Sequence, residues 1–121
     1  MKKILVVDDN PVSRELIREV LEGAQIKILE AADGQEALDR IEEEEPDLVL
    51  LDIDLPVMDG YEVLRIVRNQ SRFDNLIVVA LTAYAMQQDR EKALAAGFEH
   101  FVTKPIDVAQ LRVDVRKLLY A

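Results

Sequence analysis

The segment that most constrains the fold is residues 48–52, where four successive apolar residues end in the carboxylate of Asp52. Turn-forming residues precede this run, and a loop that contains Pro56 and Gly60 follows it. A short apolar run between turn-forming residues is typical of a buried strand in a parallel sheet. Asp52 would then lie at the C-terminal end of the strand, the edge at which open α/β sheets bind their ligands. Asp52 is therefore the first candidate for chemistry.

Strand-like and helix-like segments alternate along the whole chain. Apolar runs predict strands at residues 4–7, 26–30, 48–52, 76–81 and 101–103. The spacing of apolar residues predicts helices at 11–22, from 34, at 61–69, at 86–96 and from 108. This repetition predicts a parallel sheet with helices on both faces and right-handed crossovers. We therefore expect one domain over residues 1–121, an α/β, flavodoxin-like (βα)5 doubly wound parallel sheet with strand order 2-1-3-4-5.

Local signals place several helix ends. Asn10 and Pro11 combine a capping side chain with the proline favoured at the first helical position. Gly23 is expected to stop that helix. Asp107, with Gln110 three residues later, resembles a capping box at the start of the last helix.

The charge and composition of the chain restrict its partners. The 121 residues carry a formal net charge of -9 at pH 7, so long-range electrostatics repel nucleic acid and anionic lipid and favour a protein partner. No apolar run approaches the roughly 20 residues of a membrane span, and the N-terminal residues lack the apolar core of a signal peptide. The absence of cysteine excludes a disulfide framework and thiolate metal sites, and it suits the cytoplasm.

Polar side chains stand at the ends of four of the five predicted strands. They are Asp8 and Asp9, Asp52, Thr82 and Lys104. Because parallel strands end at the same edge of a sheet, we expect these side chains to meet in one crevice. Each of them alone has an ordinary explanation as a turn residue, a helix cap or a surface charge. Their coincidence at one edge is what indicates a functional site.

The balance of charge in this crevice predicts a bound cation. Three carboxylates facing one lysine leave an excess of negative charge, which is unfavourable without a cation. The available ligands are hard oxygens, which favour Mg²⁺ over zinc or copper. We expect Asp9 and Asp52 as direct ligands, Asp8 through water, and the backbone carbonyl of Asp54 as a further ligand.

A magnesium site beside a hydroxyl and an ammonium group suits a phosphoryl group. Thr82 is placed to donate to one phosphoryl oxygen, and Lys104 to pair with another. Asp52 is ionised at neutral pH, since an unperturbed aspartate has a pKa of about 3.9, and a carboxylate nucleophile gives an aspartyl phosphate. Neither a P-loop nor a GxGxxG motif occurs, so nothing in the sequence supports nucleotide binding.

These residues carry a resemblance to a known family. Over essentially all of its length, the chain resembles the receiver domain of two-component response regulators. The matching motifs are Val7-Asp8-Asp9-Asn10, the 52–60 loop with Pro56 and Met58-Asp59-Gly60, Thr82-Ala83, and Lys104-Pro105.

The resemblance implies a role for each matching residue. Asp52 would be the phosphoacceptor, Asp8 and Asp9 the acidic pair that holds Mg²⁺, Thr82 the switch hydroxyl and Lys104 the phosphate-binding lysine. Receivers take their phosphoryl group from a phosphohistidine on a sensor histidine kinase or a histidine phosphotransfer protein. They catalyse only their own phosphorylation and slow dephosphorylation. Because the last predicted helix reaches the end of the sequence, we expect a stand-alone receiver, with an excised domain of a larger regulator as the alternative.

The resemblance also implies a switch and an output surface. Phe101 occupies the position of the family's switch aromatic, although a strand aromatic in the core is an equal alternative. Phosphorylation would draw the Thr82 hydroxyl inward and free space for Phe101 to rotate. The face of the fourth helix, fifth strand and fifth helix would then meet a downstream protein. The resemblance further implies a cis peptide bond between Lys104 and Pro105.

Three positions depart from the commonest receiver pattern. Asp54 and Leu55 follow the expected acceptor, and Tyr84 lies two residues after Thr82. In receivers these positions line the path of the attacking water and so tune the lifetime of the phosphoryl group. We expect Tyr84 to shield the phosphoryl group and slow its hydrolysis.

Other classes of protein remain as alternatives. Asp52-Ile53-Asp54 is similar to the signature of haloacid-dehalogenase-like phosphatases, but in that family the signature opens the chain and a second acidic pair follows the lysine. A histidine phosphotransfer protein would need an exposed histidine on a helical bundle, whereas His100 starts a predicted strand. A receiver-like interaction module without phosphorylation is the third alternative.

Overall fold

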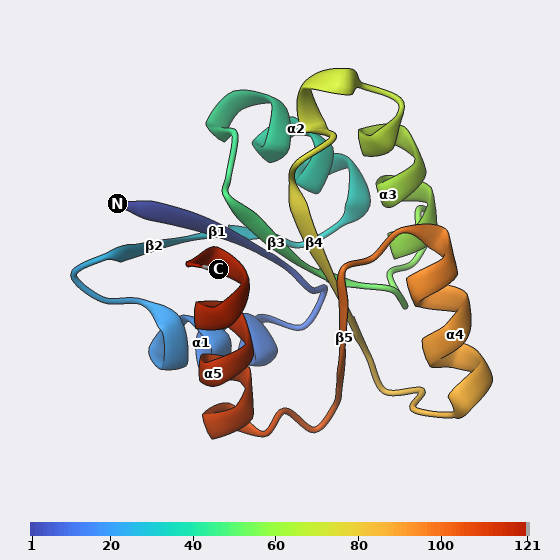
Figure 1. The fold of residues 1–121 in the computed structure, drawn as a ribbon. Coiled ribbons are helices and arrows are strands. Elements are labelled where there is room, and N and C mark those ends of the chain that lie inside the picture. The colour runs from blue at the N-terminus through green and yellow to red at the C-terminus, as the bar shows by residue number, and fades with distance from the viewer. Residues whose placement is uncertain (121) are drawn as a thin grey trace.

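The computed structural model describes residues 1–120 as a parallel sheet between two layers of helices (Figure 1). The sheet has five strands in the order β2-β1-β3-β4-β5. They are β1 (Lys2–Val7), β2 (Ile26–Ala31), β3 (Leu48–Asp52), β4 (Ile77–Thr82) and β5 (His100–Thr103). The predicted flavodoxin-like architecture and its strand order are confirmed.

The helices divide between the two faces of this sheet. They are α1 (Pro11–Leu21), α2 (Gly34–Glu44), α3 (Gly60–Arg68), α4 (Gln87–Ala96) and α5 (Val108–Leu119). Helices α1 and α5 cover one face, and α2, α3 and α4 cover the other (Figure 1). In the described residues, no helix is long and apolar enough to cross a membrane.

Strand β3 lies at the centre of the sheet and is buried on both faces. Leu48 and Leu50 face the α1 and α5 layer, and Val49 and Leu51 face the opposite layer. None of these four leucine and valine residues is more than 1% exposed. A strand buried on both faces needs apolar residues at every position rather than at alternate ones. This explains the uninterrupted apolar run that ends at Asp52.

Helix α1 begins as predicted but ends before Gly23. The Asn10 side chain accepts a hydrogen bond from the backbone N–H of Val12 at 2.9 Å, and Pro11 is the first helical residue. The helix ends at Leu21 with Glu22 in an extended conformation. Gly23 instead forms an isolated antiparallel bridge with Ile26. The predicted end of the helix is therefore correct to within one residue, but Gly23 does not end it as a left-handed cap, because neither Glu22 nor Gly23 has a positive φ.

One further prediction about local structure needs correction, and one short element was missed. Asp107 accepts a hydrogen bond from the backbone N–H of Gln110 at 3.1 Å. The Gln110 side chain, however, donates to Asp114 at 2.8 Å instead of returning to the cap, so the predicted capping box is only half formed. A short 3-10 helix, η1 (Ser71–Phe73), precedes β4 and was not predicted.

Candidate functional site

The predicted site residues lie at the C-terminal edge of the sheet. Asp8 and Asp9 follow β1, Asp52 and Thr82 end β3 and β4, and Lys104 follows β5. Strand pairing places Val7 beside Leu51, Asp52 beside Leu81, and Thr82 beside Thr103, which brings these strand ends level with one another.

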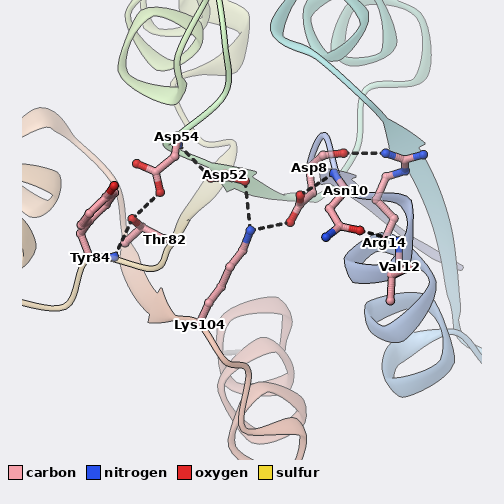
Figure 2. Close-up of polar contacts among 9 residues, drawn as sticks. All are labelled: Asp8, Asn10, Val12, Arg14, Asp52, Asp54, Thr82, Tyr84 and Lys104. Carbon is pink, nitrogen blue, oxygen red and sulfur yellow. Dashed lines mark hydrogen bonds and ion pairs between the residues drawn. The ribbon is translucent and has the colours of Figure 1, made fainter.

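Three carboxylates form the centre of the site. Asp8, Asp9 and Asp52 each place an oxygen within 4.8 Å of the others. Asp8 and Asp52 are buried, whereas Asp9 is exposed. Backbone N–H groups orient the two buried carboxylates: Asn10 donates to Asp8 Oδ1 at 2.9 Å, and Asp54 donates to Asp52 Oδ1 at 2.8 Å (Figure 2).

The ammonium group of Lys104 lies between the two buried carboxylates (Figure 2). Lys104 Nζ is 3.1 Å from Asp52 Oδ2 and 2.9 Å from Asp8 Oδ2. The backbone N–H of Lys104 donates to the Thr82 carbonyl at 2.8 Å, and the peptide bond between Lys104 and Pro105 is cis. The hydrogen bond to Thr82 fixes where the lysine side chain begins.

Burial and charge act in opposite directions on the two central groups. Burial raises the pKa of Asp52, and the Asp54 N–H and Lys104, which favour the ionised form, only partly offset this. For Lys104, burial works to lower the pKa, but the adjacent carboxylates of Asp8 and Asp52 together raise it. Lys104 is therefore held as an ammonium ion between two carboxylates.

The donor set fits a hard divalent cation. Asp8 Oδ2 is buried and, although it is at ion-pair distance from Lys104, it receives no hydrogen bond of normal geometry. A buried carboxylate oxygen without such a partner is costly, and it has the chemistry of a Mg²⁺ ligand. The adjacent Asp9 and Asp52 oxygens supply two more hard donors.

Thr82 is turned toward Asp54 rather than toward Asp52. Its Oγ1 donates to Asp54 Oδ2 at 2.7 Å and accepts from the backbone N–H of Tyr84 at 3.1 Å (Figure 2). Sequence reasoning considered the Asp54 backbone carbonyl but missed this side-chain contact. The available signal was an extra carboxylate directly after one strand end and a hydroxyl at the next.

The two aromatic residues singled out from the sequence have different environments. The Tyr84 side chain is 64% exposed, and only its backbone N–H bonds to Thr82. Phe101 is buried in the core, and the guanidinium group of Arg90 lies 5.0 Å from its ring centroid. Phe101 thus already points inward in this structure.

His100 lies at the other end of β5 from Lys104. It is the first residue of that strand, and its Nε2 is 3.1 Å from Asp114 Oδ2 on α5. The imidazole therefore pairs with a neighbouring helix and is not part of the carboxylate cluster.

The fold and site define a class of protein: a doubly wound α/β domain with a carboxylate cluster and one lysine at the C-terminal edge of its sheet. Residues 4–116 match the family described as the response regulator receiver domain. The chain therefore belongs to the response regulator receiver family of two-component systems. The phosphatase alternative is not favoured, because this match includes residues from all five strands and every residue of the site.

Three similar proteins illustrate the family. The polar-differentiation response regulator DivK of Brucella anthropi is 33% identical over 118 residues, which are 98% of this chain and 96% of that protein. The structure of the chemotaxis response regulator CheY4 of Vibrio cholerae has a TM-score of 0.91 and 29% identity, covering 98% of this chain and 99% of that one. The receiver domain of the sensor histidine kinase PA1611 from Pseudomonas aeruginosa PAO1 has a TM-score of 0.88 and 35% identity, covering 99% and 98%. The structure of that domain is described with a magnesium ion coordinated in its active-site cleft.

Proposed function

We propose that this receiver accepts a phosphoryl group onto Asp52 from a phosphohistidine of a sensor histidine kinase or a histidine phosphotransfer protein. One observation carries the proposal: Asp8, Asp9 and Asp52 converge within 4.8 Å, and Lys104 contacts two of these three carboxylates. Structural roles alone do not require so many charged groups to meet at one sheet edge.

The proposed reaction is a transfer between two nucleophiles. A carboxylate oxygen of Asp52 forms a bond to phosphorus as the bond between phosphorus and the donor's imidazole nitrogen breaks, and the electron pair of that bond stays on the imidazole. Lys104 favours the ionised form of Asp52 and provides positive charge for a phosphoryl oxygen. Thr82 would donate to a second phosphoryl oxygen after turning from Asp54.

The same proposal assigns a magnesium site. Asp8, Asp9, Asp52 and the backbone carbonyl of Asp54 would hold the ion, which when bound offsets the negative charge of the phosphoryl oxygens. The buried Asp8 Oδ2 without a hydrogen bond supports this assignment. The magnesium ion described for the similar PA1611 receiver domain supports it further.

Thr82 and Phe101 form the proposed switch toward an output protein. Thr82 ends β4, and Phe101 lies in β5. Both residues lie beside the face formed by α4, β5 and α5, which we propose as the surface for a downstream protein target. The net charge of -9 disfavours direct contact with nucleic acid or an anionic membrane. The cytoplasmic location expected from the sequence belongs to this proposal.

Intact-mass measurement tests the acceptor. The native chain, incubated with acetyl phosphate and Mg²⁺, is expected to gain one phosphoryl group of about 80 Da that hydroxylamine removes. Asp52→Asn should gain none, while Asp54→Asn, which keeps the acceptor and changes the neighbouring carboxylate, should still be modified. An equal adduct on Asp52→Asn would place the acceptor elsewhere. No adduct on the native chain from acetyl phosphate or a phosphorylated kinase would favour an interaction module without phosphorylation.

A further inference from the structure

The hydroxyl proton of Thr82 is already engaged in this structure. Thr82 is buried, its Oγ1 donates to Asp54 Oδ2 at 2.7 Å, and the same oxygen accepts from the Tyr84 N–H at 3.1 Å (Figure 2). A threonine hydroxyl has one proton to donate. Asp54 therefore holds the only proton that Thr82 can offer to a ligand.

The proposed function requires the Thr82 hydroxyl proton to point toward the phosphoryl group and not toward Asp54. After phosphorylation, Thr82 would donate to a phosphoryl oxygen carried by Asp52. One proton cannot serve the Asp54 carboxylate and the phosphoryl group in the same geometry. The two acceptors must therefore compete for it, and this step of the argument rests on the proposed function.

We propose that Asp54 is a positioning residue, whose carboxylate holds the Thr82 hydroxyl away from Asp52. A phosphoryl group on Asp52 then binds the Thr82 hydroxyl only by displacing the Asp54 carboxylate. The backbone N–H of Asp54 donates to Asp52 Oδ1 at 2.8 Å. One residue thus contacts the proposed acceptor through its backbone and the switch hydroxyl through its side chain. The backbone of Asp54 orients the acceptor, while its carboxylate opposes the movement of the Thr82 hydroxyl toward a phosphoryl group.

The surroundings of Asp54 allow its carboxylate to leave Thr82. Asp54 is exposed and lines a cavity of about 460 Å³ together with Thr82, Tyr84 and Lys92. A displaced carboxylate therefore returns to water beside a lysine and does not become a buried charge. Displacement then costs mainly the hydrogen bond to Thr82.

The expected effect of removing the Asp54 carboxylate on the binding of a phosphoryl group follows from its hydrogen bond to Thr82. A hydrogen bond to a charged group is worth a factor of about 10 to 100 in an equilibrium constant. Removing Asp54 also removes a negative charge near the phosphoryl site, which favours an anion whether or not Thr82 takes part. The test must separate these two contributions.

A double-mutant cycle makes the separation. The chains to compare are native, Asp54→Ala, Thr82→Val and the double variant, with Asp89→Asn as a charge control. Asp89 lines the same cavity, but its carboxylate accepts a hydrogen bond from the backbone N–H of Met86 and not from Thr82. Each chain is titrated with beryllium fluoride, an analogue of a phosphoryl group, in the presence of Mg²⁺. Amide NMR signals near Asp52 report binding, and urea unfolding confirms that each variant is folded.

The proposal predicts that Asp54→Ala tightens beryllium fluoride binding about 10- to 100-fold when Thr82 is present. In the Thr82→Val background the same change should tighten binding only by the smaller charge contribution. Asp89→Asn should leave the affinity within about twofold of the native value. Asp54→Asn, which keeps the side-chain size, should fall between the native chain and Asp54→Ala.

Two results would overturn the proposal. Equal tightening in both Thr82 backgrounds would reduce the effect of Asp54 to charge repulsion, and no tightening would show that Asp54 does not restrain Thr82. Both leave the proposed function intact, since the native chain still binds the analogue. If the native chain neither binds beryllium fluoride nor takes a phosphoryl group onto Asp52, the proposed function itself fails and takes this inference with it.

Discussion

Helices α3 and α4 lie on the same face of the sheet but are held in very different ways. Helix α3 buries Gly60, Val63, Leu64 and Val67, whereas α4 buries only Ala93. Lys92 of α4 lies over the ring of Tyr61 of α3, with its Nζ 4.6 Å from the centroid, so the two helices are neighbours.

This difference separates a rigid part of the molecule from a loosely anchored one. Helix α3 follows β3 and the loop after Asp52, while α4 follows the segment after Thr82. Burial of apolar side chains is the main source of helix stability in proteins. The proposed acceptor therefore belongs to a firmly packed framework, and the proposed switch adjoins the helix with the fewest apolar anchors on this face. A conformational response is easiest in an element of low local stability.

The largest expected effect comes from matched truncations in the two helices. Leu64 in α3 is 2% exposed and Leu94 in α4 is 46% exposed. Leu64→Ala should lower the free energy of unfolding by about 2–5 kcal/mol, because it leaves a cavity in the core. Leu94→Ala should change it by less than about 0.5 kcal/mol. Urea denaturation of both variants measures this, and equal losses would contradict the comparison.

Native-state hydrogen exchange tests the same difference without mutation. Amides in the middle of α4 should open with a free energy about 2 kcal/mol lower than those in α3, which corresponds to roughly thirtyfold faster exchange. Amides of β3 provide the internal reference for global unfolding. Similar protection in α3 and α4 would show that the exposed side chains of α4 do not reflect weak anchoring.

A smaller effect is expected from the ion pairs that fasten α1 to β2. Arg18 lies 2.6 Å from Glu30 and Arg14 lies 3.0 Å from it, and their hydrogen bonds hold the pKa of Glu30 below its ordinary value of 4.5. A lowered folded-state pKa gives stability that is present above the unfolded pKa and is lost as the pH falls through the folded pKa. We expect Glu30→Gln to cost about 0.5–1 kcal/mol at pH 7. The cost should disappear in urea titrations repeated at increasingly acidic pH below 4.5, whereas a cost independent of pH would point to lost packing.

The smallest effect concerns the proposed acceptor itself. Burial raises the pKa of Asp52, so the ionised carboxylate lowers stability as the pH rises through its folded-state pKa. In EDTA at pH 7, Asp52→Asn should therefore be slightly more stable than the native chain by thermal unfolding. The difference should shrink as the pH falls and the native carboxylate becomes protonated. A less stable Asp52→Asn would mean that the ion pair with Lys104 outweighs burial.

The parts of the fold that were predictable are those dictated by continuous apolar runs. β3 was placed correctly because a strand covered on both faces admits no polar position before Asp52. Once the strands are parallel, their ends share one edge, and the meeting of Asp8, Asp52 and Lys104 follows from the order of the strands. For β3 and the strand ends, the local apolar pattern and the topology of the sheet predict the same arrangement.

Side-chain directions at the edges of the site were not predictable in the same way. Thr82 had a choice of carboxylates, and which one it bonds depends on the path of the loop after β3. Gln110 likewise bonds to Asp114 instead of completing a cap, since a partner four residues along the helix is within reach. Such choices between nearby partners differ by little energy and leave no mark on hydrophobic periodicity.

Gly60 limits where a reporter group can be attached near the proposed acceptor. A Cβ atom at this position would lie 2.7 Å from Ile53 Cα and 2.8 Å from the Asp52 carbonyl oxygen, closer than real Cβ atoms come to such groups. Any side chain there must push the start of α3 away from the end of β3. A spectroscopic reporter on this loop therefore belongs at Val57, whose side chain is fully exposed, and one placed at position 60 would report its own disturbance.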